Sequence, residues 1–522
     1  MNNEELEKYR LAIKLQKDGK HKDAIDLIRT VSEPAFQAGI LIDSGTDLRK
    51  LSLVREGITL FESILNSDGQ KFSRASLLYN IGNGYSSIYQ LRRLKGVNLI
   101  APNDDDLRKA KSAYRQAFIE DKTSPKAFRS QILVNYANCL SALGRSFEAI
   151  NSYSQALEID VQNGMAAGNL GVELGRIEEI TGRYTHHYII VAYNLLSKAL
   201  GPDMHLSYGG IEAKRGFENA RDRLQEIIDA HKGRLHSLKP VSLAKAKTAK
   251  NRYISYCLKE SLFLNTWVGD QNFAPAISDE IAFGPITTTL KDSKIVPELL
   301  NILNEIKEAF VTARYLFYLS QANSKVQDDI SGVTSFFDIQ TDNLHGLYLG
   351  YCKSAYMRAF DVIDKVARIA NVYFGLGKRD DYFWHIFAER QSRGQTHELR
   401  SVARPSVIAT GNYSLYALAD LCIDYFEDEH VDFKTIDIRR NMMTHDYLLV
   451  KKYPGDFIEE NWISVDELYR QTFSVLQLAK YAILYIVSAV NISEIQKPVR
   501  GITNPVKYNI STGHSFLDIR KR

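Results

Sequence analysis

Small and apolar residues recur along the first 230 residues with the period of an α-helix. A small residue is followed by an aromatic or aliphatic residue four positions later, and by a small or apolar residue three positions after that. Positions i, i+4 and i+7 share one helix face, and small residues let a neighbouring helix approach closely. We therefore predict successive packed helices, at Ala24/Ile28/Val31, Gly57/Phe61/Ile64, Ala110/Tyr114/Ala117, Ala149/Tyr153/Ala156 and Ala192/Leu196/Ala199.

The clearest repeat unit spans residues 130–160, where Gly144 predicts a turn between two helices. This unit resembles a tetratricopeptide (TPR) repeat, although the spacing between units is irregular. We predict a degenerate TPR-like helical solenoid over residues 1–235. The alternative is a set of ordinary helical hairpins in an all-α domain. Either arrangement offers a concave surface for a protein, peptide or nucleic-acid ligand.

Longer helices are predicted in the second half of the chain. Two glycines, Gly375 and Gly377, suit a left-handed cap at the end of one of them, and Ser464 with Glu467 forms a capping box at the start of another. No alternating strand pattern intervenes, so the expected fold is all-α, with an antiparallel helical bundle over residues 291–495. The predicted helices are Ile295 to Gln321, Leu347 to Phe374, Tyr413 to Phe426, Phe433 to Lys451, and Ser464 to Asn491.

Two further segments complete the predicted organisation. Residues 236–290 are expected to be a linker and a lead-in strap to the bundle, because Pro240 and a basic, Ala-rich stretch precede an apolar run from Asn251 to Asn265. Residues 496–522 form a basic, turn-rich tail.

Composition narrows the cellular setting of the protein. The chain has 522 residues, 45% of them hydrophobic, and a net charge of only +4, so any nucleic-acid contact must come from a local patch. The four cysteines are scattered, which favours a reducing compartment over a zinc site or disulfide framework. The N-terminus is acidic, and the most apolar window, Leu478 to Val490, contains Lys480 and falls short of a membrane span. We predict a cytoplasmic protein without membrane contact.

One short stretch late in the chain carries candidate chemistry. Arg440, Asn441 and His445 place a guanidinium, a carboxamide and an imidazole close together on one predicted helix. An arginine followed by a histidine at this approximate spacing also occurs at Arg379/His385 and Arg390/His397, so spacing alone selects none of them. Only Arg440/His445 is predicted to lie early in a helix, with a polar residue directly after the arginine.

Helical geometry gives these three residues different directions. Asn441 and His445 share a face at i and i+4, whereas Arg440 points about 140° away from His445. The arrangement suggests two copies of the chain that meet across an interface. It is equally possible that Arg440 and His445 are exposed or salt-bridged helix residues, with Asp437 and Asp446 as partners.

The stretch resembles the Arg-Asn-x-x-x-His signature of the HEPN superfamily, whose helical domains are often metal-independent ribonucleases. This resemblance, over about residues 250–495, implies an endoribonuclease that uses the 2′-hydroxyl of RNA and needs no metal or cofactor. It implies that His445 transfers protons, Arg440 binds the phosphate and Asn441 orients either group, with Arg439 as a second phosphate binder. HEPN ribonucleases build one cleft from two protomers, so a homodimer or higher homo-oligomer is expected.

The resemblance to TPR-fused HEPN proteins also implies a biological setting. Such proteins look like bacterial antiviral or stress-response effectors, in which the helical array senses a signal or restrains the nuclease. A non-catalytic alternative remains, with the TPR-like half as a scaffold for a partner and the bundle as a dimerisation or RNA-binding module.

A second basic segment is predicted to be a loop between Arg390 and Arg404. Its four arginines suit a phosphate backbone, which makes them candidate RNA-binding residues. Pairing with the acidic run Glu427 to Glu429 is an equally good interpretation. The four residues are Arg390, Arg393, Arg400 and Arg404.

Overall fold

The protein folds into two compact units, and both consist mainly of α-helices. The first unit comprises residues 1–175 and 188–235, and the second comprises residues 176–187 and 236–522. The predicted all-α class is confirmed. The computed structural model describes residues 3–67, 71–96, 101–181, 186–206, 210–231, 248–267, 277–289, 291–322, 325–336, 343–377, 382–392, 399–427, 433–452, 461–498 and 505–508.

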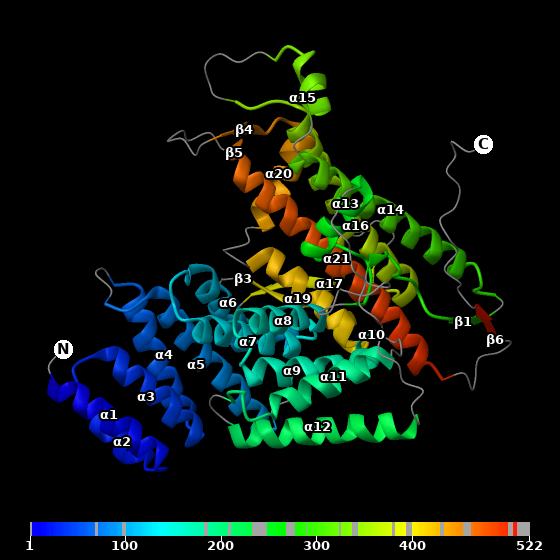
Figure 1. The fold of residues 1–522 in the computed structure, drawn as a ribbon. Coiled ribbons are helices and arrows are strands. Elements are labelled where there is room, and N and C mark those ends of the chain that lie inside the picture. The colour runs from blue at the N-terminus through cyan, green and yellow to red at the C-terminus, as the bar shows by residue number, and fades with distance from the viewer. Residues whose placement is uncertain are drawn as a thin grey trace. The chain divides into compact units, whose positions relative to one another are not determined.

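Stacked helix pairs build the first unit, in which each helix from α1 to α9 packs against the next one along the chain, and α11 and α12 both pack on α9 (Figure 1). The elements are α1 (Asn3–Lys17), α2 (His21–Ile28), α3 (Pro34–Asp47), α4 (Leu51–Leu65), α5 (Arg74–Leu94), a 3-10 turn (Ala101–Asn103), α6 (Asp105–Glu120), α7 (Lys126–Ala142), α8 (Ser146–Ile159), α9 (Gly164–Gly175), α11 (His186–Ala199) and α12 (Gly210–Ala230).

The recurring residues of the sequence pattern lie in the cores between these helices. Ala110, Tyr114 and Ala117 on α6 are each at most 2% exposed, and the corresponding residues of α2, α8 and α11 are buried as well. Gly144, between α7 and α8, has a φ of 83°, a conformation that favours glycine. The pattern therefore identified the buried helix faces and the turn correctly.

Close helix packing leaves no room for a methyl group at Gly82 on α5. A Cβ atom there would lie 2.7 Å from Cε1 of the buried Tyr114. We expect Gly82→Ala to lower the free energy of unfolding of the first unit by about 1 to 3 kcal/mol, because the ring has to move in a packed core. Urea denaturation followed by circular dichroism measures the change.

Gly39→Ala provides a matched control for this prediction. Gly39 also lies within a helix, α3, but a Cβ atom there meets nothing within 4 Å. Alanine is the better helix former by about 1 kcal/mol, so this variant should be at least as stable as the wild type. Equal losses in both variants would contradict the close packing at Gly82.

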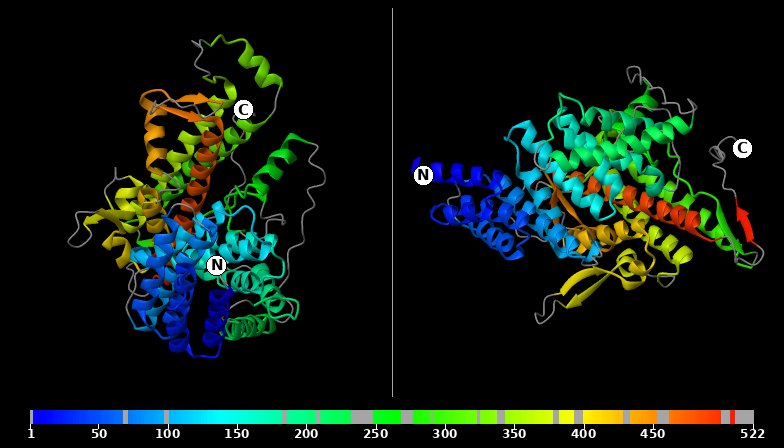
Figure 2. Two further views of the ribbon diagram at one scale, coloured as in Figure 1. Left: turned by 90° about the vertical axis from the view of Figure 1, so that its left-hand side faces the viewer. Right: turned by 90° about the horizontal axis from the view of Figure 1, so that it is seen from below.

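Three long helices, α14, α16 and α21, pack side by side in the second unit, and α19 packs on α21 (Figures 1 and 2). The elements are α10 (Ile177–Thr181), α13 (Ala249–Lys259), β1 (Ile286–Thr289), α14 (Ile295–Gln321), α15 (Lys325–Gly332), α16 (Leu347–Phe374), α17 (Phe383–Phe387), β2 (Ala388–Ser392), β3 (Leu399–Ala403), α18 (Pro405–Ala409), α19 (Tyr413–Glu427), α20 (Phe433–His445), β4 (Leu449–Lys451), β5 (Trp462–Ser464), α21 (Val465–Gln496) and β6 (Pro505–Tyr508).

Several predicted helix ends agree with the structure. The bounds of α14 and α16 are those predicted, and Gly375 ends α16 with a φ of 66° in the left-handed region. Ser464 caps α21, since its hydroxyl oxygen accepts a hydrogen bond from the backbone N–H of Glu467 at 3.2 Å. Local capping signals therefore determine these ends.

Residues 249–267 and 277–289, called here the strap, contact the bundle, and Arg314 of α14 binds residues in both parts. The guanidinium is 2% exposed and binds both carboxylate oxygens of Asp279 at 2.7 and 2.8 Å. It also donates to the Tyr253 hydroxyl and the Leu262 carbonyl, each at 2.8 Å. Burial alone would lower the pKa of Arg314, but the bonds to Asp279 outweigh it and raise the pKa, so the side chain stays charged.

Helix α21 corrects the expectation about the apolar window near Lys480. The helix has 32 residues and, by length and composition, could cross a membrane, so the prediction that this stretch is too short was wrong. Within the described structure 78% of its apolar window is buried. Lys480 itself is 2% exposed and donates to the carbonyl of Ser261 in the strap at 2.5 Å. Packing inside the bundle accounts for the apolar sequence.

Short strands occur where the sequence predicted only helices and loops. Strands β1 and β6 pair antiparallel, as do β2 and β3, whereas β4 and β5 pair in parallel. The predicted loop between Arg390 and Arg404 was therefore wrong at both ends, because β2 and β3 form a hairpin there, drawn in yellow in Figure 2. Residues 393–398, which include Arg393, lie outside the described residues.

Candidate functional site

The candidate residues lie at the end of α20, the penultimate helix. Its last residue is His445, and Asp446 donates its backbone N–H to the carbonyl of Met442 at 2.9 Å before strand β4 begins. The prediction that the motif lies early in a helix reaching Lys451 was wrong. The sequence after His445 is apolar because Leu448 and Val450 are buried around β4, not because the helix continues.

Helix α16 holds the guanidinium of Arg440 in place. The Cζ atom of Arg440 lies 4.5 Å from the centre of the buried Phe360 ring, and Nη1 lies 3.8 Å from a carboxylate oxygen of Asp364. Phe360 and Asp364 are one helical turn apart and therefore lie on the same face of α16. A ring and a carboxylate together restrict both the position and the orientation of the planar guanidinium.

Asn441 joins this arrangement through its side chain, whose Oδ1 accepts a hydrogen bond from Nη2 of Arg440 at 3.2 Å. Asn441 and His445 are exposed, and Arg440 is about one quarter exposed. Among the described residues, no hydrogen bond or ion pair joins His445 to Arg440 or Asn441. The structure therefore brings the side chains of Arg440 and Asn441 together and leaves the imidazole of His445 exposed at the C-terminal end of α20.

Arg439 is directed to a different helix. Its Nη1 lies 3.7 Å from a carboxylate oxygen of Glu467, near the start of α21. Burial would raise the pKa of Glu467, but hydrogen bonds and charge from Arg470, and the charge of Arg439, lower it below its ordinary value. Glu467 is therefore an anion near neutral pH, and a phosphate at Arg439 would have to compete with it.

The basic residues of the β2–β3 hairpin are not equivalent. Arg390 is exposed and lies opposite Ser401, whereas Arg400 is half-buried and lies opposite Gln391. Arg404 precedes α18 and donates to the backbone carbonyl of His385. Arg390 is thus the described arginine of this group most open to solvent. The predicted pairing with Glu427 to Glu429 involves side chains outside the described residues.

The part of the chain that the structure describes contains no group of three or more histidine, cysteine, aspartate or glutamate side chains that could hold a metal ion. The four cysteines are buried and unpaired with one another.

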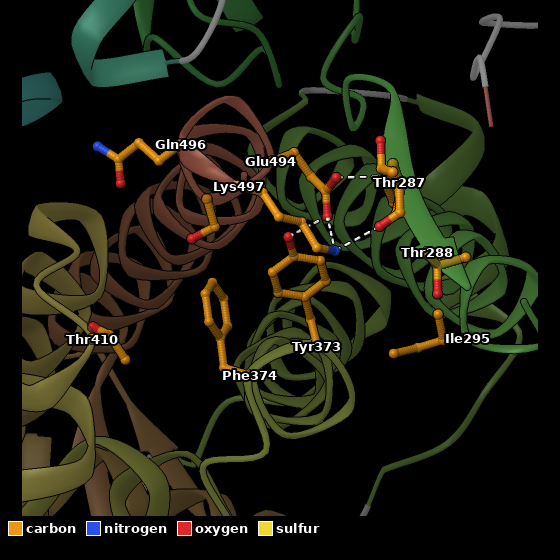
Figure 3. A pocket seen from close by; sticks show the side chains of 11 residues that line it. Thr287, Thr288, Ile295, Tyr373, Phe374, Thr410, Glu494, Gln496 and Lys497 are labelled. Carbon is orange, nitrogen blue, oxygen red and sulfur yellow. Dashed lines mark hydrogen bonds and ion pairs between the residues drawn. The ribbon is translucent and has the colours of Figure 1, made fainter. Parts of the chain in front are cut away.

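A pocket of about 380 Å³ lies at the other end of α21 from the candidate residues (Figure 3). Glu494, in its lining, comes 27 residues after Glu467, which corresponds to roughly 40 Å along a helix. Its carboxylate accepts hydrogen bonds from the hydroxyl of Tyr373 at 2.5 Å and the backbone N–H of Thr287 at 2.7 Å, and Lys497 lies 3.2 Å away. These polar groups bind one another and tie β1, α16 and α21 together.

Two residues of the candidate site had no motif to identify them. Phe360 and Asp364 precede Arg440 by 80 and 76 positions, so only the packing of α16 on α20 brings them near it. The sequence around them offers one local signal: the ionisable Asp364 follows the core residue Phe360 by four positions, so both lie on one face of a helix.

Comparison with known families supports the assignment of the helical bundle. The model of the LA2681-like HEPN family matches residues 290–493, which include α14 to nearly the end of α21 and all the candidate residues on α20. The C-terminal half of the chain is thus similar to an LA2681-like HEPN domain. No curated protein matches the chain.

Proposed function

We propose that the protein is a metal-independent endoribonuclease with Arg440, Asn441 and His445 as its catalytic residues. The observation that carries the proposal is the Arg-Asn-x-x-x-His stretch on the penultimate helix of a bundle similar to HEPN domains, with the guanidinium seated on Phe360 and Asp364. The exposed Asn441 and His445 are accessible to a large substrate such as RNA.

The proposed reaction uses the 2′-hydroxyl of the RNA as its nucleophile. The 2′-oxygen attacks the adjacent phosphorus atom, the bond from phosphorus to the 5′-oxygen breaks, and the 2′-proton leaves as a proton enters the departing oxygen. An imidazole, as on His445, can act as the base that accepts such a proton or as the acid that donates it. Arg440 binds the phosphate and stabilises the negative charge of the transition state. The products carry a 2′,3′-cyclic phosphate and a 5′-hydroxyl.

A second copy of the chain supplies the other half of the proposed cleft. Two large apolar side chains near the motif are exposed, Ile438 by 44% and Tyr447 by 59%. Exposed apolar side chains on either side of the candidate residues suit burial against a second copy. The direction of Arg440 towards α16, away from the exposed His445, also suits a cleft in which the two groups come from different protomers. Light scattering that finds only monomer under active conditions would contradict this part of the proposal.

The product ends provide the direct test of the proposed reaction. Purified protein is incubated with total RNA in EDTA, and the ends of the fragments are analysed. We expect cleavage to persist in EDTA, because the proposed reaction draws on no metal ion, and the fragments to carry 2′,3′-cyclic phosphates and 5′-hydroxyls. Loss of cleavage in EDTA, or 5′-phosphate ends, would contradict the proposal and favour a non-catalytic scaffold or contaminating nuclease.

Asp364 is a positioning residue in this scheme. Asp364→Asn keeps the size of the side chain but removes the charge that faces Arg440, so the guanidinium loses part of its orientation. We expect kcat for RNA cleavage to fall about tenfold without a rise in KM, since misplacement of a catalytic group costs rate rather than binding. Initial rates over a range of RNA concentrations measure both constants.

Asp361→Asn is the matched control on the same helix. Asp361 is exposed, and its carboxylate lies 3.9 Å from Arg358 and forms no ion pair with Arg440. Its loss should leave kcat unchanged. If Asp361→Asn and Asp364→Asn lower kcat equally, a general change of surface charge explains the effect and the positioning role is wrong.

A further inference from the structure

We propose that four tyrosine rings on α13 and α14 bind single-stranded RNA by stacking against its bases. The group, called here the tyrosine platform, consists of Tyr253 and Tyr256 on α13 and Tyr315 and Tyr318 on α14. The proposal rests on the proposed function for the choice of RNA, and it adds a binding site outside the reacting centre and a preference for unpaired bases. Helix α13 precedes residues 290–493, so half of the platform lies outside the HEPN-like region.

The four rings form one continuous cluster. Each helix contributes two tyrosines three positions apart, which therefore lie on one helix face. The ring centre of Tyr253 lies 5.3 Å from those of both tyrosines of α14. The ring centre of Tyr256 lies 5.1 Å from that of Tyr318, whose ring is nearly parallel to that of Tyr315, with 27° between the two planes. Each ring is restricted by at least one other, which lowers the entropy lost on binding.

Hydrogen bonds hold the two tyrosines of α13 in place. The hydroxyl of Tyr253 accepts a hydrogen bond from Nε of the buried Arg314 at 2.8 Å, and that of Tyr256 accepts one from Nε2 of Gln321 at 3.1 Å. The hydroxyls of the two tyrosines of α14 make no hydrogen bond with the described residues. Tyr315 is 47% exposed, and the other three tyrosines are half-buried. The platform is therefore fixed through α13 and open to a ligand on the side of α14.

Positively charged side chains alternate with a tyrosine along one face of α13. Arg252, Tyr256 and Lys259 occupy positions i, i+4 and i+7, which share a helix face, and both charged side chains are exposed. Lys250 is a third exposed cation, and Glu260, which follows the helix, pairs with Lys259 at 3.3 Å. Three cations and one carboxylate give this segment a net charge of +2. Proteins that bind single strands combine rings that stack on bases with cations that bind the backbone.

Two features favour RNA over a protein as the ligand of the platform. Every aliphatic side chain of α13 and α14 is buried or half-buried, so these helices lack the exposed apolar anchors from which a protein interface is built. Residues 309–322, which include the last turns of α14, contain no acidic side chain that would repel a phosphate.

The platform lies at the end of the bundle that also carries the candidate catalytic residues. The carbonyl of Ser320, two positions after Tyr318, accepts a hydrogen bond from the hydroxyl of Tyr469 on α21 at 2.6 Å. Two positions before Tyr469 is Glu467, which pairs with Arg439 of α20. About two helix diameters, roughly 20 Å, therefore separate the platform from α20. One RNA strand can reach both sites.

The binding of a short single strand and of its duplex tests the proposal. The full-length His445→Ala variant is titrated with labelled RNA of about 12 nucleotides, a length within the site sizes of single-strand-binding folds, and fluorescence anisotropy gives the Kd. We expect the single strand to bind at least about tenfold more tightly than the duplex, since only unpaired bases can stack on the rings. Absence of RNA binding, or equal affinity for the duplex, would overturn the proposal.

Tyr315→Leu and Tyr315→Phe identify the platform as the binding surface. Leucine removes the aromatic ring, so Kd for the single strand should rise about tenfold, whereas phenylalanine keeps the ring and should bind like the wild-type side chain. Tyr413→Leu, at a 69% exposed tyrosine on α19, is the matched control and should also bind normally. Equal affinity of all three folded variants would contradict the platform.

A ligand-side experiment decides the matter even if a variant misfolds. An RNA with a central run of about four abasic nucleotides keeps its phosphates but loses the bases that stack on the rings. We expect its affinity for the His445→Ala protein to be at least about tenfold lower than that of the unmodified strand. Unchanged affinity would show that phosphate charge alone holds the RNA and that the rings take no part.

Cleavage assays separate this proposal from the proposed reaction. In protein with His445 intact, Tyr315→Leu should raise KM for the short RNA about tenfold and leave kcat unchanged, because the ring binds substrate away from the reacting phosphate. RNA binding by the platform without cleavage would contradict the reaction and support the platform. Cleavage with an unchanged KM in Tyr315→Leu would contradict the platform and leave the reaction intact.

Discussion

Arg440→Ala and His445→Ala are each expected to lower the rate of RNA cleavage at least a hundredfold. General acid–base catalysis by a histidine contributes about 10² to 10⁴ in rate, and a charge-stabilising donor contributes a similar factor. The exposed side chain of His445 makes no hydrogen bond or ion pair with the described residues, so its loss should not alter folding. Initial rates on total RNA in EDTA, with thermal unfolding measured for each variant, separate lost chemistry from lost structure.

Two controls accompany these variants. His385→Ala removes another exposed imidazole, from the Arg379/His385 cluster, and should cleave at the wild-type rate. Arg440→Lys keeps the positive charge but not the planar fork, and should lie between Arg440→Ala and the wild type. Full activity of folded Arg440→Ala and His445→Ala would show that these residues are not the catalytic site.

Mixing the two inactive variants tests whether one cleft uses both protomers. In a twofold dimer with shared clefts, the mixed dimer has one cleft that lacks both groups and one that has both. Equal mixing gives half mixed dimers, so about a quarter of the wild-type activity should return. If the protomers exchange, as shown by a tagged partner, and no activity returns, each site is contained within one protomer.

Arg314→Met is expected to cause the largest loss of stability, about 3 kcal/mol in the second unit. The substitution leaves the Asp279 carboxylate and the Tyr253 hydroxyl without their buried donor, and removal of one member of a buried ion pair costs about 3 to 5 kcal/mol. The lower end applies because Asp279 is 21% exposed. Guanidinium denaturation followed by tyrosine and tryptophan fluorescence measures the change.

Arg368→Ala is the control for this prediction. Arg368 pairs with Glu298 at 3.4 Å, and both side chains are more than 40% exposed. Pairs of this kind contribute less than about 1 kcal/mol. If the two arginine variants are equally stable, the strap does not depend on the buried ion pair.

Local signals in the sequence were sufficient for much of the fold. The helical period identified the buried faces of α6 and α8, and glycine and serine caps located the ends of α16 and α21. These signals involve residues within one or two turns of each other, so the energies that determine them are visible in a short window. The Arg-Asn-x-x-x-His motif could likewise be recognised from residues within one short window.

Tertiary contacts explain what the sequence did not reveal. The end of α20 at His445 is accompanied by the pairing of β4 with β5, whose partner residue Trp462 lies 13 positions after Leu449. The support of Arg440 by Phe360 and Asp364 depends on how two helices pack. A single sequence contains no local pattern for either contact. The site residues themselves stay predictions until the variants are measured.

The pairing of β1 with β6 has a consequence for the modular use of the second unit. These strands flank residues 290–493, and Ile286 lies opposite Tyr508 in an antiparallel register. The chain segments just before and just after the HEPN-like region, residues 290–493, therefore lie side by side. A domain whose two ends meet can be inserted into a surface loop of another protein with little strain. This helical bundle is consequently suited to insertion into chains whose other domains differ.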